Sequence, residues 1–303
     1  MKQMKNNTML LLTALIWGCA FVAQSVGMDY VGPFTFNCVR SILGSVVLIP
    51  VIFLTDGLKK KSGMSEEERK KERGETGTLV TGGICCGVFL AIASSLQQFG
   101  ILYTTVGKAG FVTAMYIVLV PILGIVIGRK IRPLIVVCVC IAVAGLYFLC
   151  MTERLSLGIG DLLVLLCALV FAVHILVIDH FSPLVDGVRM SAIQFLTAGL
   201  ICAVPMLIWE RPEAGEILAA WMPILYAGVM SCGVAYTLQI LGQRNADPTV
   251  ASLLLSLESV FSVLAGWVIL GQRLSGRELF GCALMFAAII LAQMPDRKQE
   301  SRT

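Results

Sequence analysis

Glu258 is the residue with the clearest chemical potential, because it stands alone in an apolar stretch. Residues 249–270 contain no other ionisable side chain, and Glu258 lies near their middle. A carboxyl group in apolar surroundings must face a cavity, pair with a cation or carry a proton. We therefore expect Glu258 to exchange protons or to bind a cationic group of a ligand. A structural hydrogen bond between helices is the alternative interpretation.

Arg40 and His174 are two further ionisable residues inside apolar stretches. The planar guanidinium of Arg40 offers a fork of donors to an anionic ligand. It could instead carry its charge to solvent along its apolar stem, or pair with Glu258. The imidazole of His174 titrates near neutral pH, which suits a proton relay. A hydrated ring near the end of its segment is the competing interpretation.

Several uncharged side chains could complete such a site. Gln98 and Gln239 place amide groups in apolar stretches, where they bind a polar ligand or form hydrogen bonds between helices. Trp17 and Tyr116 add rings that either line a cavity or pack against neighbours.

Motifs for other kinds of chemistry are absent from the sequence. It contains no HExxH, no GxSxG and no phosphate-binding loop, and its two histidines are His174 and His180. We therefore predict no metal site, no cofactor and no enzymatic activity. The net charge of +4 comes from short loops and gives no reason to expect nucleic-acid binding.

The elements that must position these residues are apolar runs of about 20 residues, the length of a membrane-spanning helix. The chain is 57% hydrophobic and 14% charged, with a mean hydropathy of +0.88. Lipid requires internally satisfied backbone groups, and these runs lack the alternation of barrel strands. We predict an all-α integral membrane protein with ten transmembrane helices at 9–28, 34–55, 78–99, 107–128, 133–151, 160–178, 190–209, 219–241, 249–270 and 277–294.

Basic residues predict the orientation of these spans. With a cytoplasmic N-terminus, the inner segments hold 17 Lys and Arg residues and the outer segments hold 5. This bias over short loops predicts that both termini are cytoplasmic, in a multi-pass protein of the cell membrane. Between Lys59 and Gly74 we expect a short cytoplasmic helix, capped by Ser65 with Glu68 three residues later.

The chain divides into two related halves, 1–151 and 152–303. An offset of 154 places Arg40 on Gln194 and Trp17 on Phe171, and an offset of 141 later places Gln98 on Gln239. Since each half holds five spans, the second half is inverted with respect to the first. Inverted repeats are typical of secondary transporters that bind their solute near the midplane.

Small residues predict where helices approach closely. The pairs Gly83 with Gly87 and Gly124 with Gly128 have the spacing of such contacts.

The chain also resembles the EamA-like family of the drug/metabolite transporter superfamily, along its whole length. The resemblance rests on Trp17-Gly18, on Arg40, on 108–111 with 119–121, and on Leu257-Glu258. Ser259 departs from it, because the family often has Pro there. The resemblance implies transport of small metabolites, often outward, with some members exchanging phosphorylated sugars or nucleotide sugars.

The sequence therefore predicts a secondary active transporter that exports a small polar, amino-acid-like metabolite by alternating access. Protons or another ion drive it, membrane lipids surround it, and it is a monomer or homodimer. An integral-membrane enzyme acting on a lipid is the alternative, and a channel or scaffold is a third possibility.

Overall fold

The computed structural model describes residues 2–104, 106–150, 158–244, 246–270 and 275–292. Every element in these ranges is helical, which confirms the all-α prediction. The elements up to residue 150 are α1 (Lys2–Gly27), α2 (Pro33–Lys61), α3 (Glu66–Arg73), α4 (Thr76–Ile101), α5 (Val106–Thr113), α6 (Tyr116–Val126) and α7 (Pro133–Cys150).

The elements after residue 157 include two π-helical segments, named η1 and η2. They are α8 (Ile159–Phe181), α9 (Gly187–Pro205), η1 (Met206–Glu210), α10 (Ala214–Ala219), α11 (Trp221–Leu225), η2 (Tyr226–Tyr236), α12 (Thr237–Gln243), α13 (Pro248–Leu255), α14 (Glu258–Leu270) and α15 (Gly276–Ala292).

Eight helical segments of the described chain are long and apolar enough to cross a membrane. They are Gln3–Gly27, Pro33–Lys61, Glu66–Ile101, Ala109–Val126, Ile159–Phe181, Gly187–Glu210, Trp221–Gln243 and Pro248–Ala265. The predicted spans 133–151 and 277–294 fall on α7 and α15, which are not among these eight. The apolar stretch of α7 is Pro133–Phe148, and α15 has 17 residues. The count of ten spans therefore stays a prediction.

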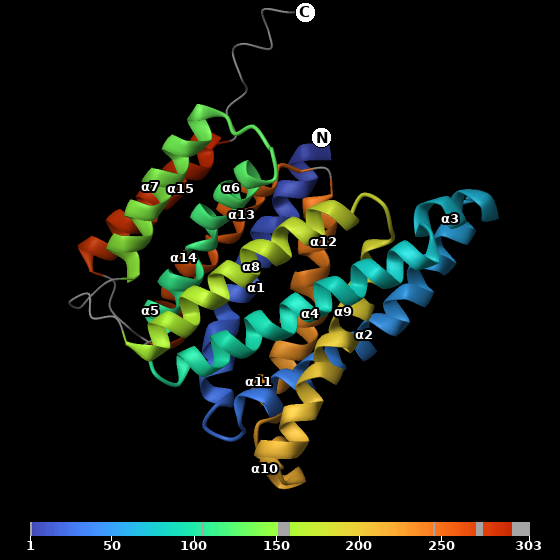
Figure 1. The fold of residues 1–303 in the computed structure, drawn as a ribbon, viewed down its shortest axis with the longest axis horizontal. Coiled ribbons are helices and arrows are strands. Elements are labelled where there is room, and N and C mark those ends of the chain that lie inside the picture. The colour runs from blue at the N-terminus through green and yellow to red at the C-terminus, as the bar shows by residue number, and fades with distance from the viewer. Residues whose placement is uncertain (1, 105, 151–157, 245, 271–274, 293–303) are drawn as a thin grey trace, which may run out of the picture.

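Helices from early and late in the chain pack against one another. α2 lies along α9, α4 packs on both α8 and α9, and α1 packs on α14, η2 and α12. Figure 1 shows α7 and α15 side by side at the opposite side of the molecule from α2. The largest core cluster joins residues such as Leu10, Ile117 and Leu255 from distant parts of the sequence.

One of the two predicted glycine contacts exists. A Cβ on Gly83 would lie 2.5 Å from Ile193 Cγ2, and one on Gly87 would lie 2.5 Å from Thr197 Cβ, so α4 and α9 touch there. The prediction for Gly124 and Gly128 is wrong. Gly128 has φ +83° and no heavy atom near the position of a Cβ, so it ends a helix instead of packing.

The predicted short helix is confirmed as α3. Glu68 N donates to Ser65 Oγ at 3.1 Å, and Ser65 N donates to Glu68 Oε2 at 2.9 Å, which forms a capping box. α3 lies at the end of α2 and α4, away from the rest of the bundle (Figure 1). Its location in the cytoplasm stays a prediction.

Candidate functional site

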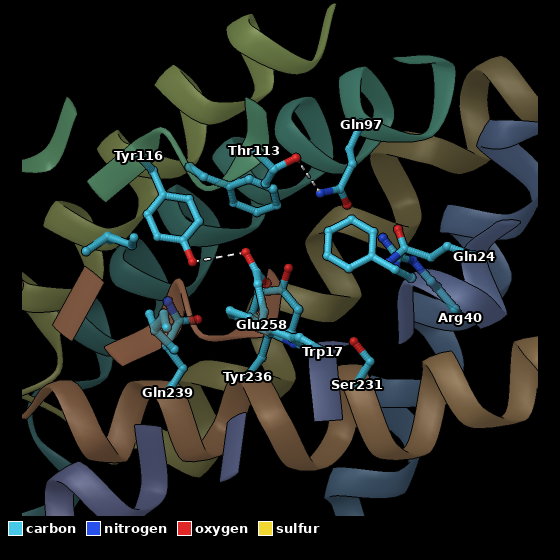
Figure 2. Close-up of a pocket in the computed structure, with 14 residues that line it drawn as sticks. Trp17, Gln24, Arg40, Gln97, Thr113, Tyr116, Ser231, Tyr236, Gln239 and Glu258 are labelled. Atoms are coloured by element: carbon cyan, nitrogen blue, oxygen red, sulfur yellow. Dashed lines mark hydrogen bonds between the residues drawn. The ribbon is translucent and has the colours of Figure 1, made fainter. Parts of the chain in front are cut away.

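A cavity lies inside the bundle and contains most of the predicted site residues. It encloses about 480 Å³ of space free of atoms, part of it open to solvent. Its aromatic lining consists of Trp17, Phe21, Tyr116, Phe171 and Tyr236. Its polar lining consists of Gln24, Arg40, Gln97, Thr113, Ser231, Gln239 and Glu258 (Figure 2).

Two broken helices position Tyr116 and Glu258 in this lining. The segment that contains α5 and α6 turns at Ala114-Met115, and the segment that contains α13 and α14 turns at Ser256-Leu257, 142 positions later. The tightened bonds also match: Ile117 N donates to Ala114 O at 3.0 Å, and Ser259 N donates to Ser256 O at 3.2 Å. These i→i−3 bonds are 3₁₀ in type, and such interruptions often mark functional sites.

Tyr116 and Glu258 each begin the second part of a broken helix, and they meet across the cavity. The Tyr116 hydroxyl donates to Glu258 Oε1 at 3.0 Å, as the dashed line in Figure 2 shows. Glu258 is 4% exposed, and no cation of the described residues lies within ion-pair distance of it. The carboxyl group therefore has one neutral partner in a cavity.

Gly18 allows α1 to approach the backbone of α14 closely at Glu258. A Cβ on Gly18 would lie 2.8 Å from Glu258 O and 2.6 Å from Phe261 Cβ, so any side chain would push α14 away. The neighbouring Trp17 ring packs on Tyr236 with centroids 4.5 Å apart. Ser259, which stands where the resembling family often has Pro, donates through its hydroxyl to Gly110 O at 3.3 Å.

Arg40 points into the cavity and is buried, so the alternative in which its stem carries the charge to solvent is wrong. It is 4% exposed, and its guanidinium lies 5.5 Å from the Phe36 ring centre. Within the described part of the chain, Arg40 forms no ion pair with Glu258 or any other carboxylate. Its Nε has no hydrogen-bond partner.

The predicted pairing of Gln98 with Gln239 is wrong by one residue. Gln239 lines the cavity, but its partner there is Gln97, 142 positions earlier. Gln98 is fully buried outside the cavity, where its Nε2 contacts Met28 Sδ at 3.4 Å. The cause is η2, because π turns hold more residues than α turns and shift the residues that follow.

His174 is neither hydrated nor part of the cavity lining. It is fully buried, and its Nε2 lies 3.1 Å from Gln194 Oε1. Its ring also makes an edge contact with Tyr236, with centroids 6.2 Å apart. His174 therefore supports the wall behind Tyr236 in this structure, and its role as a proton relay stays a prediction.

The remaining lining residues carried weak sequence signals. Thr113 and Ser231 are common residue types in helices, so nothing marked them in the sequence. Phe21 stands 154 positions before Ile175, and both line the cavity, so they form a pair at the same offset as Trp17 and Phe171. That offset was visible in the sequence at Trp17 and Phe171 and could have led to Phe21.

Comparison with known proteins identifies the family. The sequence profile of the EamA-like transporter family matches residues 4–151 and 158–294. The chain belongs to the EamA-like transporter family. Membership, together with the eight apolar helices, makes it a multi-pass membrane protein of a transporter family.

Individual relatives agree with this assignment. An uncharacterized transporter of Archaeoglobus fulgidus is 28% identical over 286 residues, covering 94% of this chain and 84% of that protein. The uncharacterized transporter YoaV of Bacillus subtilis is 23% identical over 288 residues, covering 91% and 92%. A solved crystal structure at 20% identity has a TM-score of 0.75 and covers 97% of this chain, which supports the fold.

Proposed function

We propose that this member of the EamA-like family is a secondary active transporter that carries a small polar metabolite through the cavity by alternating access. Glu258 is the group that couples transport to an ion gradient. The solute is amino-acid-like, the driving ion is a proton, and the direction is export across the cell membrane, with both termini in the cytoplasm.

The observation that carries this proposal is that the buried Glu258 carboxyl group has no charged partner among the described residues. A carboxylate in a membrane interior costs about 2.5–3.5 kcal/mol unless it is compensated. Glu258 has one neutral hydrogen-bond partner, Tyr116, and no ion pair among the described residues. A proton or a cationic solute group would complete the site, and gain or loss of that charge can bias one conformation over another.

The packing supports two exchangeable halves. If the segments are numbered by the ten predicted spans, the third packs on the seventh (α4 on α9), and the eighth packs on the second (η2 on α2). Likewise the ninth packs on the first (α14 on α1), and the fourth packs on the sixth (α6 on α8). A pseudo-twofold axis through the cavity would relate these contacts, and alternating access then needs only their exchange.

The lining supports a small solute. Ligand pockets combine apolar walls with a few polar groups that fix the orientation of the ligand. The cavity has aromatic walls and amide groups from Gln24, Gln97 and Gln239. These features favour a metabolite with both apolar and polar parts.

The test uses purified protein in proteoliposomes with an imposed pH gradient. A metabolite library is screened for compounds that raise the thermal stability of the protein, since a ligand that prefers the fold stabilises it. Uptake of the radiolabelled hit is then measured with and without the gradient. We expect gradient-driven uptake in the wild type and loss of that stimulation in Glu258→Gln.

Glu66→Gln on the exposed helix α3 is the matched control and should transport like the wild type. Unchanged gradient-driven uptake by Glu258→Gln would remove the coupling role. Uptake that never saturates and shows no exchange of internal for external solute would indicate a channel.

A further inference from the structure

Most residues of the cavity lining have a counterpart in the other half of the chain, and four do not. Ten of its fourteen lining residues form five pairs separated by 154 or 142 positions. The pairs are Trp17 with Phe171, Phe21 with Ile175, Gln97 with Gln239, Thr113 with Leu255, and Tyr116 with Glu258. The other four residues, Gln24, Arg40, Ser231 and Tyr236, have no such counterpart in the lining.

All four of these residues can donate hydrogen bonds, and three of them lie away from Tyr116. Figure 2 shows Arg40, Gln24 and the matched residue Gln97 at one side of the cavity, Ser231 toward the same side, and Tyr116 at the other side. Arg40 contributes a forked set of N–H donors, Gln24 an amide, and Ser231 a hydroxyl. The Arg40 side of the cavity therefore presents donors together with a positive charge.

These side chains are buried, and the Arg40 guanidinium lacks a charged partner among the described residues. Arg40, Gln24 and Ser231 are each at most 5% exposed. The donor Arg40 Nε has no hydrogen-bond partner, and Arg40 has no ion pair among the described residues. The acceptor Gln24 Oε1 has no partner either. An isolated buried cation is strongly unfavourable unless an anion or water completes its surroundings.

Phe36 limits where the guanidinium can go. Its ring lies 5.5 Å from Arg40 Cζ, one helical turn earlier on α2. This cation–π contact holds the stem without using the N–H donors. Arg40 is thus held in place while its hydrogen-bonding capacity stays free for a ligand.

We propose that Arg40, with Gln24 and Ser231, forms a carboxylate-binding subsite separate from Glu258. The inference rests on the proposed function and specifies its solute. The transported molecule carries a carboxylate that binds at the Arg40 side, while its remaining part lies among the aromatic rings toward Glu258. Arginine suits this task because its planar fork matches the two oxygens of a carboxylate.

The test measures binding of small probes, so it does not depend on transport. Thermal unfolding of purified protein is followed during titration with propionate, inorganic phosphate or the neutral isostere propionamide, at constant ionic strength. We expect propionate to raise the unfolding temperature of the wild type more than propionamide or phosphate does. Arg40→Gln should lower the apparent affinity for propionate at least about tenfold.

Three further variants complete the design. Arg40→Lys keeps the charge without the forked donors and should retain part of the stabilisation by propionate. Gln24→Leu removes an amide but keeps the charge of Arg40, and it should weaken the stabilisation by propionate. Arg211→Gln replaces an exposed arginine and should respond like the wild type. Because Gln24→Leu retains Arg40, it also tests the subsite if Arg40→Gln does not fold.

Two results would overturn the subsite. One is an equal response to propionate and propionamide, and the other is a response that persists unchanged in Arg40→Gln and Gln24→Leu. A response to phosphate alone would refute the carboxylate assignment. These failures are separate from failure of the proposed function, because gradient-driven uptake that depends on Glu258 can exist without any Arg40-dependent binding of propionate.

Discussion

The ends of the α2–α9 pair differ from the cavity between the halves in how their charged groups are satisfied. At one end, which we call the Asp56 end, Arg189 Nη2 and Nη1 donate to the two oxygens of Asp56 at 2.6 and 3.2 Å. Lys59 lies 3.2 Å from Glu72 and 3.3 Å from Asp186. Each of these charges has an opposite partner.

The other end, which we call the Glu210 end, uses one carboxylate. Glu210 accepts hydrogen bonds from Phe34 N at 2.9 Å and from both the N–H and the hydroxyl of Thr35 at 2.6 Å. It thereby caps the first turn of α2. Glu210 stands 154 positions after Asp56, and Arg189 stands 154 positions after Thr35, so the two ends occupy equivalent places in the halves.

The difference between the paired ends and the unpaired cavity separates two tasks. The ends join α2 to α9 with groups that satisfy one another, which stabilises the fold. The cavity keeps Glu258 and Arg40 without charged partners among the described residues, which leaves them free for a proton or a ligand. Changes at the ends should therefore reduce stability, whereas changes in the cavity should mainly affect binding and transport.

The largest loss of stability is expected at the Asp56 end. Arg189→Met leaves a partly buried Asp56 with only the longer contact to Arg73, at 3.6 Å. Hydrogen bonds to charged groups contribute about 1.5–3 kcal/mol, so we expect a loss of about 2 kcal/mol in the free energy of unfolding. A double-mutant cycle with Asp56→Leu, followed by thermal unfolding in detergent, measures it.

The cycle itself provides the control. If the pair stabilises the fold directly, the double variant should lose at least about 1 kcal/mol less than the sum of the single variants. Additive losses would mean that the two residues act independently and that the Asp56 end does not hold α2 to α9.

A smaller loss is expected at the Glu210 end. Glu210→Gln keeps one oxygen acceptor but turns an NH₂ group toward backbone N–H donors of α2. Loss of an N-terminal cap costs about 1 kcal/mol, and we expect a similar decrease in the free energy of unfolding. Thermal unfolding measures it, with Glu67→Gln on exposed α3 as the control. Equal stability of the two variants would show that Glu210 caps α2 without stabilising it.

Glu258→Gln should change stability less than either end does. The glutamine oxygen can still accept the hydrogen bond of Tyr116, and no ion pair is lost. We expect a change of less than about 0.5 kcal/mol in the free energy of unfolding, measured under the same conditions. A loss as large as that of Arg189→Met would show that Glu258 is a structural carboxyl group, which the sequence had left as its alternative role.

The sequence was sufficient to find the ionisable residues of the cavity, but it did not show where the two helices are broken. Glu258 and Arg40 stand out because ionisable groups are rare in apolar runs, and both line the cavity. The turns at Ala114-Met115 and Ser256-Leu257 contain neither Gly nor Pro, so no local signal marked them. They arise from packing between distant helices, which a single sequence does not display.

The sequence also did not show that the offset between the two halves changes by one residue. Gly87 aligns with Gly228 at an offset of 141, whereas Gln97 aligns with Gln239 at 142. The change occurs across η2, whose π turns have no sequence signature as clear as a proline. The structure therefore replaces Gln98 by Gln97 as the cavity residue, although the two are neighbours in the chain.

The smallest effect is expected from Gln98→Met, which tests this register. Gln98 makes one weak contact to Met28 and leaves its Oε1 unpaired, so methionine fills its place at almost no cost in stability. Gln97→Met is the matched variant, because it removes an amide that lines the cavity and donates to Thr113 at 3.3 Å. A lost neutral hydrogen bond corresponds to about fivefold in affinity, so Gln97→Met should weaken binding of the transported solute by that factor while Gln98→Met leaves it unchanged. Thermal-shift titration of both variants with the same solute measures the difference. An equal weakening of binding by both variants would place Gln98 in the binding site and would support the offset of 141, which aligns Gln98 with Gln239.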